Sequence, residues 1–230
     1  MKKYNIHPYC EANHSGTVRR VFTRKSYHTG ETMVVISING KSIAQADELV
    51  KALSSLDKNI TSIFLNVNTQ KNNLVLGDKN ILLYGKPVIC DILCGLKYEI
   101  SPSSFYQINP VQTEKLYAKA IEYAAIKPNE SVLDIYCGIG TISLCAAKYA
   151  KKVVGVEIVE AAIQNAKKNA LNNNISNTDF YAGSAENVVP KLLSNGFAPD
   201  VVILDPPRKG SDAATLSAIA AAMPNRIVYV

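Results

Sequence analysis

The run Val-Leu-Asp-Ile-Tyr-Cys-Gly-Ile-Gly at residues 132–140 constrains the fold more than any other part of the chain. Its first half is mostly apolar, as in a buried strand, and two glycines then interrupt it before a helix-forming segment that starts at Thr141. Glycines at such a junction permit a tight turn and let a ligand approach the backbone closely. A strand, a glycine turn and a helix in succession form the unit that binds nucleotides at the carboxyl edge of open parallel sheets.

The rest of the chain after residue 111 repeats this alternation of strand and helix. The apolar periodicity predicts helices over residues 112–125, 141–149, 160–171, 186–194 and 212–223, and strands over 132–137, 153–158, 179–181, 201–204 and 226–230. Repeated strand–helix units join into a parallel sheet with helices on both faces. The sequence therefore predicts an α/β fold with a Rossmann-like, doubly wound sheet of about five strands.

The first hundred residues follow a different pattern. Short β-like runs recur at 33–38, 60–67, 74–76, 81–83, 88–93 and 96–100, and helical spacing lies between residues 44 and 56. The stretches at 70–73 and 84–87 are typical of hairpin turns. We therefore expect a smaller α+β domain of mostly antiparallel strands over residues 1–100, followed by the parallel-sheet domain over residues 101–230.

Charge is also distributed unevenly between these two parts. Residues 1–100 contain 13 Lys and Arg against 8 Asp and Glu, whereas residues 101–230 contain 12 against 11. Arg19, Arg20, Arg24 and Lys25 form a basic cluster in the first part. RNA contact would explain this cluster, and a solvated basic face is the alternative.

Targeting and redox signals point to the cytoplasm. No apolar run approaches the length of a membrane span, and the amino end lacks the apolar core of a signal peptide, so we predict no membrane partner. Five cysteines without a framework spacing predict reduced thiols and a cytoplasmic location. Cys90 and Cys94 have a spacing that could hold a metal, but no further ligand cluster accompanies them and we predict no metal site.

Two features of the predicted nucleotide site favour S-adenosylmethionine over a dinucleotide. The third glycine of the dinucleotide-binding fingerprint is replaced by Ser143. Asp134 lies just before the glycine turn, where a carboxylate would repel a diphosphate and attract an ammonium. S-adenosylmethionine carries an ammonium and a sulfonium and no phosphate. A glycine turn that serves only to reverse the chain is the alternative.

Three more residues near strand ends are candidates for the same site. Glu157 ends the next strand, where an acid accepts hydrogen bonds from ribose hydroxyls, although a helix cap is the commoner role. Tyr136 lies beside the glycine turn and could pack on the cofactor, or be an ordinary sheet residue. Asp205 follows a predicted strand, and two prolines stiffen the loop after it. Arg208 stands where enzymes that methylate exocyclic amines tend to have an aromatic ring, which favours a carbon target.

Together with the segment Ser-Pro-Ser-Ser-Phe-Tyr-Gln-Ile-Asn-Pro-Val-Gln-Thr-Glu-Lys-Leu-Tyr at 101–117, these motifs resemble those of the RNA (uracil-5-)-methyltransferase family. The resemblance covers nearly the whole chain, including Glu-Ala-Asn-His-Ser-Gly-Thr-Val-Arg-Arg at 11–20. It implies that Gln107, Tyr136, Glu157 and Asp205 contact S-adenosylmethionine, and it favours 23S ribosomal RNA over transfer RNA as the substrate. Apart from the resemblance, Gln107 would be taken for a loop residue that caps the following helix.

The resemblance also implies a mechanism. Members of the family methylate carbon 5 of uridine after a cysteine thiolate adds to carbon 6, and a base then removes the proton from carbon 5. The family's cysteine follows the fifth strand, so we expect the nucleophile just beyond Val230 and no catalytic residue within this chain. We expect the chain to be truncated at both ends relative to the family and inactive alone, with any iron–sulfur cysteines upstream.

Two other functions remain open on the sequence. The chain could be a catalytically inactive fragment that binds cofactor and RNA, or a methyltransferase whose substrate is not RNA. The sequence does not indicate the oligomeric state or the target uridine.

Overall fold

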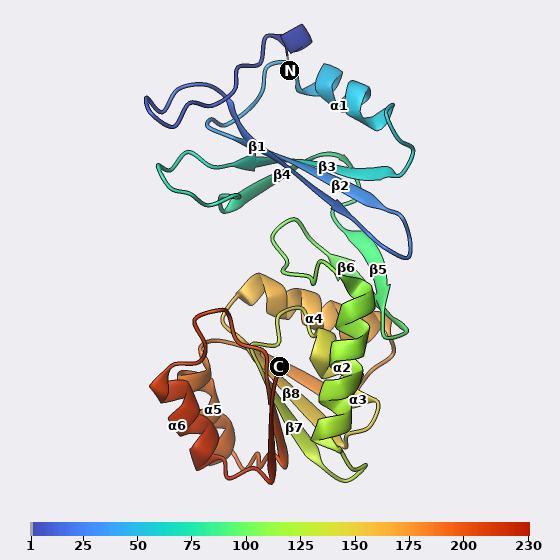
Figure 1. The fold of residues 1–230 in the computed structure, drawn as a ribbon, viewed down its shortest axis with the longest axis vertical. Coiled ribbons are helices and arrows are strands. Elements are labelled where there is room, and N and C mark those ends of the chain that lie inside the picture. Colours follow the sequence, from blue (N-terminus) through green and yellow to red (C-terminus); the bar gives the residue numbers. More distant parts are fainter. Residues whose placement is uncertain (1) are drawn as a thin grey trace. The chain divides into compact units, whose positions relative to one another are not determined.

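The computed structural model describes residues 2–230, which form two compact units (Figure 1). Unit 1 consists of the residues up to Asp91 together with Glu99–Ser103, and unit 2 consists of Ile92–Tyr98 and Ser104–Val230. Composition alone placed one boundary near residue 100. The structure instead divides a β-hairpin between the two units.

Unit 1 contains a four-stranded sheet with the order β1-β2-β3-β4. A short 3₁₀ turn, Lys2–Tyr4, precedes it, and the elements are β1 (Val18–Lys25), β2 (Thr32–Ile38), α1 (Ala46–Ser54), β3 (Ile60–Val67) and β4 (Lys79–Gly85). β2 and β3 pair in parallel, and the two outer pairs are antiparallel. Leu49 of α1 packs with Ile36 and Ile63 in the core of this unit.

Three sequence predictions for unit 1 need correction. The run at 74–76 is not a strand, because side chains bind the backbone around it: Asn68 Nδ2 donates to the Leu74 carbonyl at 2.9 Å, and Asn66 Oδ1 accepts from the Gly77 N–H at 2.7 Å. Strand β1 was missed because charged and polar residues interrupt its apolar positions. The stretch at 84–87 is not a hairpin turn, since β4 and β5 belong to different sheets.

Strands β5 (Ile89–Leu93) and β6 (Leu96–Ile100) form the two-stranded hairpin. The two residues between the strands, Cys94 and Gly95, both have positive φ, 52° and 71°. Two left-handed residues in a two-residue loop define a type I′ turn, whose twist matches that of the flanking strands.

Unit 2 confirms the predicted α/β fold with a sheet of five parallel strands, in the order β11-β10-β7-β8-β9. The strands are β7 (Ser131–Ile135), β8 (Lys152–Glu157), β9 (Thr178–Ala182), β10 (Val201–Leu204) and β11 (Arg226–Tyr229). The helices are α2 (Pro110–Ala124), α3 (Thr141–Ala147), α4 (Glu160–Asn172), α5 (Ala185–Ser194) and α6 (Ala213–Ala221). The chain winds outward from β7 in both directions, so a crevice is expected where β7 and β10 end.

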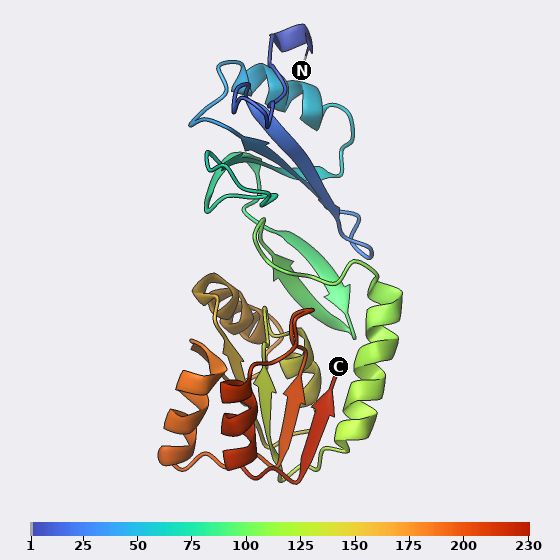
Figure 2. The same cartoon turned by 60° about the vertical axis from the view of Figure 1, so that its left-hand side comes forward.

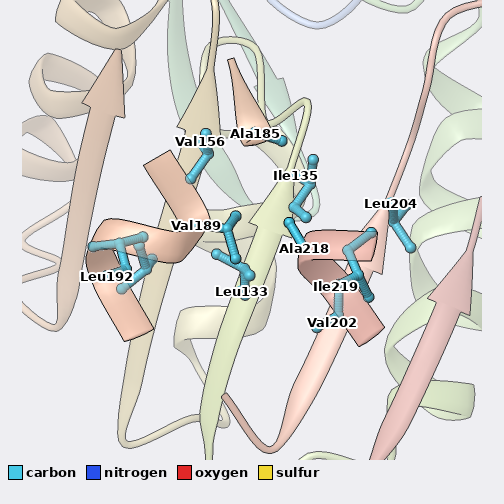
Figure 3. Packing of buried hydrophobic residues seen from close by; sticks show 11 residues of the cluster. Leu133, Ile135, Val156, Ala185, Val189, Leu192, Val202, Leu204, Ala218 and Ile219 are labelled. Carbon is cyan, nitrogen blue, oxygen red and sulfur yellow. The ribbon is translucent and has the colours of Figure 1, made fainter. Parts of the chain in front are cut away.

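Both faces of this sheet are covered, which explains why its strands are apolar almost throughout. Leu133 and Val202 lie on the face that packs against Val189 of α5 and Ile219 of α6 (Figure 3). Helix α2 runs along the opposite side of the sheet from α5 and α6 (Figure 2). Asp134, one position after Leu133, lies on this second face and is bonded to α3.

The aromatic ring of Phe180 in β9 packs against the backbone of β8 and of the glycine turn. A Cβ atom built on Gly155 would lie 2.6 Å from Phe180 Cδ1 and 2.9 Å from Cys137 Sγ. A Cβ atom on Gly140 would lie 3.2 Å from Phe180 Cζ. The two glycines therefore make room for the ring, and the ring fixes the turn against β8.

We predict that Gly155→Ala destabilises unit 2 by about 1–3 kcal/mol, because the added methyl group overlaps Phe180 in a closely packed core. Urea unfolding followed by circular dichroism measures this loss. Gly40→Ala is the matched control, since its nearest neighbour, Ser42 O, would lie 4.0 Å from the new Cβ. Equal losses in the two variants would contradict the packing argument.

Candidate cofactor site

A hollow lies where β7 and β10 end, at the switch point of the sheet. It is lined by residues from the segment before α2, from α2 itself, from the glycine turn with the start of α3, and from the end of β10: Phe105, Tyr106, Gln107, Tyr117, Asp134, Tyr136, Cys137, Gly138, Ile139, Thr141, Ile142 and Asp205. Three of the four residues expected to contact the cofactor, Gln107, Tyr136 and Asp205, therefore meet here, together with Asp134. Glu157 does not line the hollow and contacts the glycine turn instead.

The turn that forms the floor of the hollow has a left-handed backbone at three positions, with φ values of 67° at Tyr136, 55° at Gly138 and 84° at Gly140. A Cβ atom on Gly138 would meet nothing within 4 Å, so this peptide is accessible from the hollow. Tyr136 holds a backbone conformation that residues other than glycine rarely adopt. Such strain costs on the order of 1–3 kcal/mol and is typical of functional sites.

Glu157 links the glycine turn to the next helix. Its Oε2 accepts from the Gly138 N–H at 3.2 Å, and its Oε1 accepts from the Val159 N–H at 3.0 Å. Glu157 therefore bonds both the glycine turn and Val159, the residue directly before α4. A carboxylate has about four lone-pair sites, so Glu157 can accept further hydrogen bonds besides these two.

Asp134 is the most unusual group of the site because a fully buried carboxyl group lies in the central strand. Ser143 Oγ donates to its Oδ2 at 2.5 Å, and within residues 2–230 its Oδ1 has no hydrogen-bond partner. Burial raises the pKa of Asp134 to about 7, with a smaller contribution from the negative charge of Asp205. A cation placed in the hollow would supply the missing donor and favour the charged carboxylate.

Asp205 follows β10 directly and is half-buried, and burial raises its pKa above the ordinary value. The loop after it closes on itself, because the Gly210 N–H donates to the Pro207 carbonyl at 2.7 Å. Arg208, within this closed loop, is exposed. The proline pair therefore belongs to a short, braced loop beside the hollow.

Two further lining residues, which no sequence motif indicated, form one hydrogen-bonded pair. The hydroxyl of Tyr117 in α2 lies 3.0 Å from Thr141 Oγ1, and Tyr117 is only 2 % exposed. Tyr98 of β6 also donates to the Thr141 carbonyl, at 3.2 Å. No local sequence pattern identifies these residues, because α2, the β5–β6 hairpin and the start of α3 come together only in the folded unit. Phe105 was not indicated either, and it is 72 % exposed although it lines the hollow.

Cys137 is the one described cysteine that lines the hollow, and burial raises its pKa well above the ordinary value. A thiol kept protonated in this way is a weak nucleophile.

Across residues 2–230, no group of three or more His, Cys, Asp or Glu side chains is placed to hold a metal ion. Within the same residues, no helix has the length and apolar character needed to cross a membrane.

The basic cluster of unit 1 is partly used within that unit. Arg19 donates to the carbonyls of Asn68 and Asn72 at 2.8 and 2.7 Å, and its guanidinium lies over the ring of Tyr9. Arg24 donates to the Ser101 carbonyl at 3.1 Å. The other two members of the cluster, Arg20 and Lys25, are exposed on the edge strand β1.

The parallel sheet, the glycine turn and the hollow at the switch point define unit 2 as a domain with the fold of S-adenosylmethionine-dependent methyltransferases. Residues 126–225 match the family model described as "Methyltransferase domain". The comparison therefore agrees with the fold class predicted from the sequence.

Comparison over the whole chain points more narrowly to RNA methyltransferases. The chain is 46 % identical over 230 residues to an "Uncharacterized RNA methyltransferase" of Enterococcus faecalis and 45 % identical to one of Clostridium tetani, covering 50 % of each relative. The chain thus spans about half the length of these curated relatives. The crystal structure of Pyrococcus abyssi tRNA (uracil-54, C5)-methyltransferase in complex with S-adenosyl-L-homocysteine matches 99 % of this chain and 53 % of its own, with a TM-score of 0.80 and 27 % identity.

We predict that the buried carboxyl of Asp134 makes the stability of unit 2 fall as pH rises. Its pKa is raised from 3.8 to about 7 on folding. The contribution of this group to the free energy of unfolding is therefore fully present below about pH 4 and is lost as the pH rises through about 7. Asp134→Asn should remove this loss, worth on the order of a few kcal/mol, and make the variant the more stable protein at pH 8. Urea unfolding at pH 5 and pH 8 measures the difference.

Glu160→Gln provides the control for this prediction, because Glu160 is an exposed carboxylate at the start of α4. Its pH dependence should follow that of the original protein. A variant at Asp134 that loses as much stability between pH 5 and pH 8 as the original protein would show that Asp134 is charged throughout.

Proposed function

We propose that the hollow binds S-adenosylmethionine and that the protein is an RNA (uracil-5-)-methyltransferase acting in the cytoplasm. The single observation that carries the cofactor proposal is Asp134, which lines the hollow and whose buried Oδ1 has no partner within residues 2–230. The ammonium of the cofactor is a donor of the right charge for that atom. The relative of known structure was solved with S-adenosyl-L-homocysteine.

The residues around the hollow suggest a role for each part of the cofactor site. Asp134 and Gln107 would hold the amino-acid end, Tyr136 would pack against the ligand, and Glu157 would accept from the ribose hydroxyls. Asp205, at the end of β10, would face the transferred group. The bound cofactor supplies an electrophilic methyl group, and the protein contributes its orientation and the exclusion of water.

Uridine carbon 5 is the acceptor that best fits this chain. A thiolate that adds to carbon 6 makes carbon 5 nucleophilic; after methyl transfer, loss of the carbon-5 proton and of the cysteine completes the substitution. Cys137 is a poor candidate for this thiolate because burial keeps it protonated. Since the chain spans about half of its curated relatives, we propose that the remaining part contributes both the nucleophile and the base.

An RNA substrate is supported by the relatives and by exposed groups in each unit. Arg20 and Lys25 in unit 1 are available to contact phosphates. In unit 2, the exposed ring of Phe105 at the hollow could stack on an extruded base. Ribosomal RNA remains our prediction, whereas the relative of known structure is a tRNA methyltransferase by its name.

These 230 residues should bind S-adenosyl-L-homocysteine with an affinity that depends on two carboxylates. We predict that Asp134→Asn and Glu157→Gln each weaken binding at least about tenfold, because each removes a charge-assisted hydrogen bond. Isothermal titration calorimetry gives the dissociation constants. Glu160→Gln, three residues from Glu157 and exposed, should leave the affinity unchanged.

Asp134→Asn is the most informative of these variants because it should stabilise the protein at pH 8 while weakening ligand binding. Opposite changes of this kind are expected where a group is kept for function at the expense of stability. Unchanged affinity in both carboxylate variants would remove the support for the cofactor site.

The atom that receives the methyl group can be identified in the full-length gene product. With RNA that carries tritium on uridine carbon 5, we predict one tritium released to water for each methyl group incorporated, because substitution at carbon 5 displaces its hydrogen. Scintillation counting of the water and of methyl label in the RNA gives both numbers. Unmodified ribosomal RNA and transfer RNA are tested in parallel to identify the substrate.

Methyl incorporation without tritium release would place the methyl group on another atom and overturn the uracil-5 assignment. The 230-residue chain should bind cofactor in the calorimeter yet release no tritium, which also distinguishes the second candidate, a binding fragment, from the complete enzyme. Incorporation into protein or small molecules, with none into either RNA, would support the remaining alternative.

A further inference from the structure

A second hollow lies in unit 2 between α2, the end of α3 and the turn between β5 and β6. It is lined by Cys94, Tyr117, Ala118, Ile121, Cys145, Lys148 and Tyr149. Only Tyr117 is shared with the proposed cofactor site, so the second hollow has its own chemistry. Its notable feature is a pair of thiols from segments 51 residues apart in the chain.

The two cysteines line the same hollow. The side chain of each shifts the pKa of the other. Both are free thiols; Cys94 is partly exposed and Cys145 is buried. Two free thiols that line one open hollow are within reach of a small oxidant from solvent.

The turn that carries Cys94 is held in place by its neighbours. The Cys94 N–H donates to Glu114 Oε1 at 2.8 Å, and Lys148 Nζ donates to the Cys94 carbonyl at 2.7 Å. Lys148 lines the same hollow as both cysteines. The turn that carries Cys94 is therefore held at the wall of the hollow by hydrogen bonds to α2 and to the residue after α3.

The two thiols have unequal environments. Interaction with Cys145 lowers the pKa of Cys94, although burial and the charge of Glu114 act in the opposite direction. Interaction with Cys94 and burial raise the pKa of Cys145. A more acidic, accessible thiol beside a buried, protonated one is the usual arrangement of a peroxide-sensitive cysteine and its resolving partner.

We propose that Cys94 and Cys145 are a modification site at which hydroperoxides form a reversible disulfide. The Cys94 thiolate attacks one peroxide oxygen; the O–O bond breaks, sulfur is oxidised to a sulfenic acid and the other oxygen leaves as hydroxide. The sulfur of Cys145 then attacks Cys94, its proton passes to the departing hydroxide, and water leaves as the S–S bond forms. Two thiols and one hydrogen peroxide thus give one disulfide and two waters.

The disulfide would join the β5–β6 turn to helix α3. That helix begins at Thr141, which lines the first hollow and is already bonded to Tyr98 and Tyr117. Oxidation would therefore restrain the helix that follows the glycine turn. The modification site itself does not depend on the proposed methyltransferase function.

Mass spectrometry of the 230-residue chain after treatment with hydrogen peroxide tests the proposal. We expect the loss of two hydrogens per chain, a cross-linked peptide containing Cys94 and Cys145, and full reversal by dithiothreitol. Cys94→Ser should abolish the cross-link. Cys145→Ser should leave a sulfenic acid on Cys94 that dimedone traps. Cys10→Ser and Cys90→Ser are matched controls that should keep the cross-link.

A measurement on the unaltered protein guards against variants that fold poorly. Limited iodoacetamide should alkylate Cys94 several-fold faster than Cys145, and chains alkylated at Cys94 should no longer form the disulfide. The proposal is overturned if the cross-link persists in Cys94→Ser, if dimedone labels Cys94 no more than Cys10 in Cys145→Ser, or if peroxide joins other cysteines first.

Discussion

The packing of one aromatic ring against two glycines holds the site of unit 2 together. The ring of Phe180 occupies the space that side chains at Gly155 and Gly140 would take. The ring therefore packs directly against the backbone of β8 and of the glycine turn. Protein interiors are close-packed, and an added methyl group at such a contact must displace its neighbours. The turn is therefore fixed relative to β8, and Glu157 at the end of that strand reaches the Gly138 amide. This contact therefore holds in place the glycine turn that lines the hollow.

The buried carboxyl of Asp134 shows how the same site balances stability against ligand binding. A carboxyl group within a central strand is costly to ionise, and its raised pKa expresses that cost. Ser143 satisfies one oxygen, and within residues 2–230 the other oxygen has no partner. We interpret this as a site prepared for a cation, which would complete the hydrogen bonds of Asp134 and restore its charge.

Charge counts were a weaker guide to function than individual contacts. The excess of basic residues in the first hundred suggested a polyanion surface, yet Arg19 and Arg24 serve to hold loop carbonyls within unit 1. Arg20 and Lys25 remain exposed on β1. The RNA proposal therefore rests mainly on the similarity to RNA methyltransferases, to which these two residues add a limited electrostatic argument.

The sequence by itself determined the architecture of unit 2 and the residues to examine first. The apolar periodicity gave every strand and helix of the parallel sheet, because strands buried on both faces and amphipathic helices leave strong local patterns. Motif spacing brought Tyr136 and Asp205 into consideration, the family resemblance added Gln107, and all three line the first hollow.

Only the tertiary structure decided contacts between segments distant in the chain. It placed the Tyr117–Thr141 pair at the hollow, gave Glu157 its bonds to the Gly138 and Val159 amides, placed Cys94 and Cys145 at one second hollow, and turned residues 74–76 into a loop held by Asn68. Each depends on burial and on partners that no local pattern specifies. Hydrogen bonding and the pKa of a group are set by what surrounds it in space.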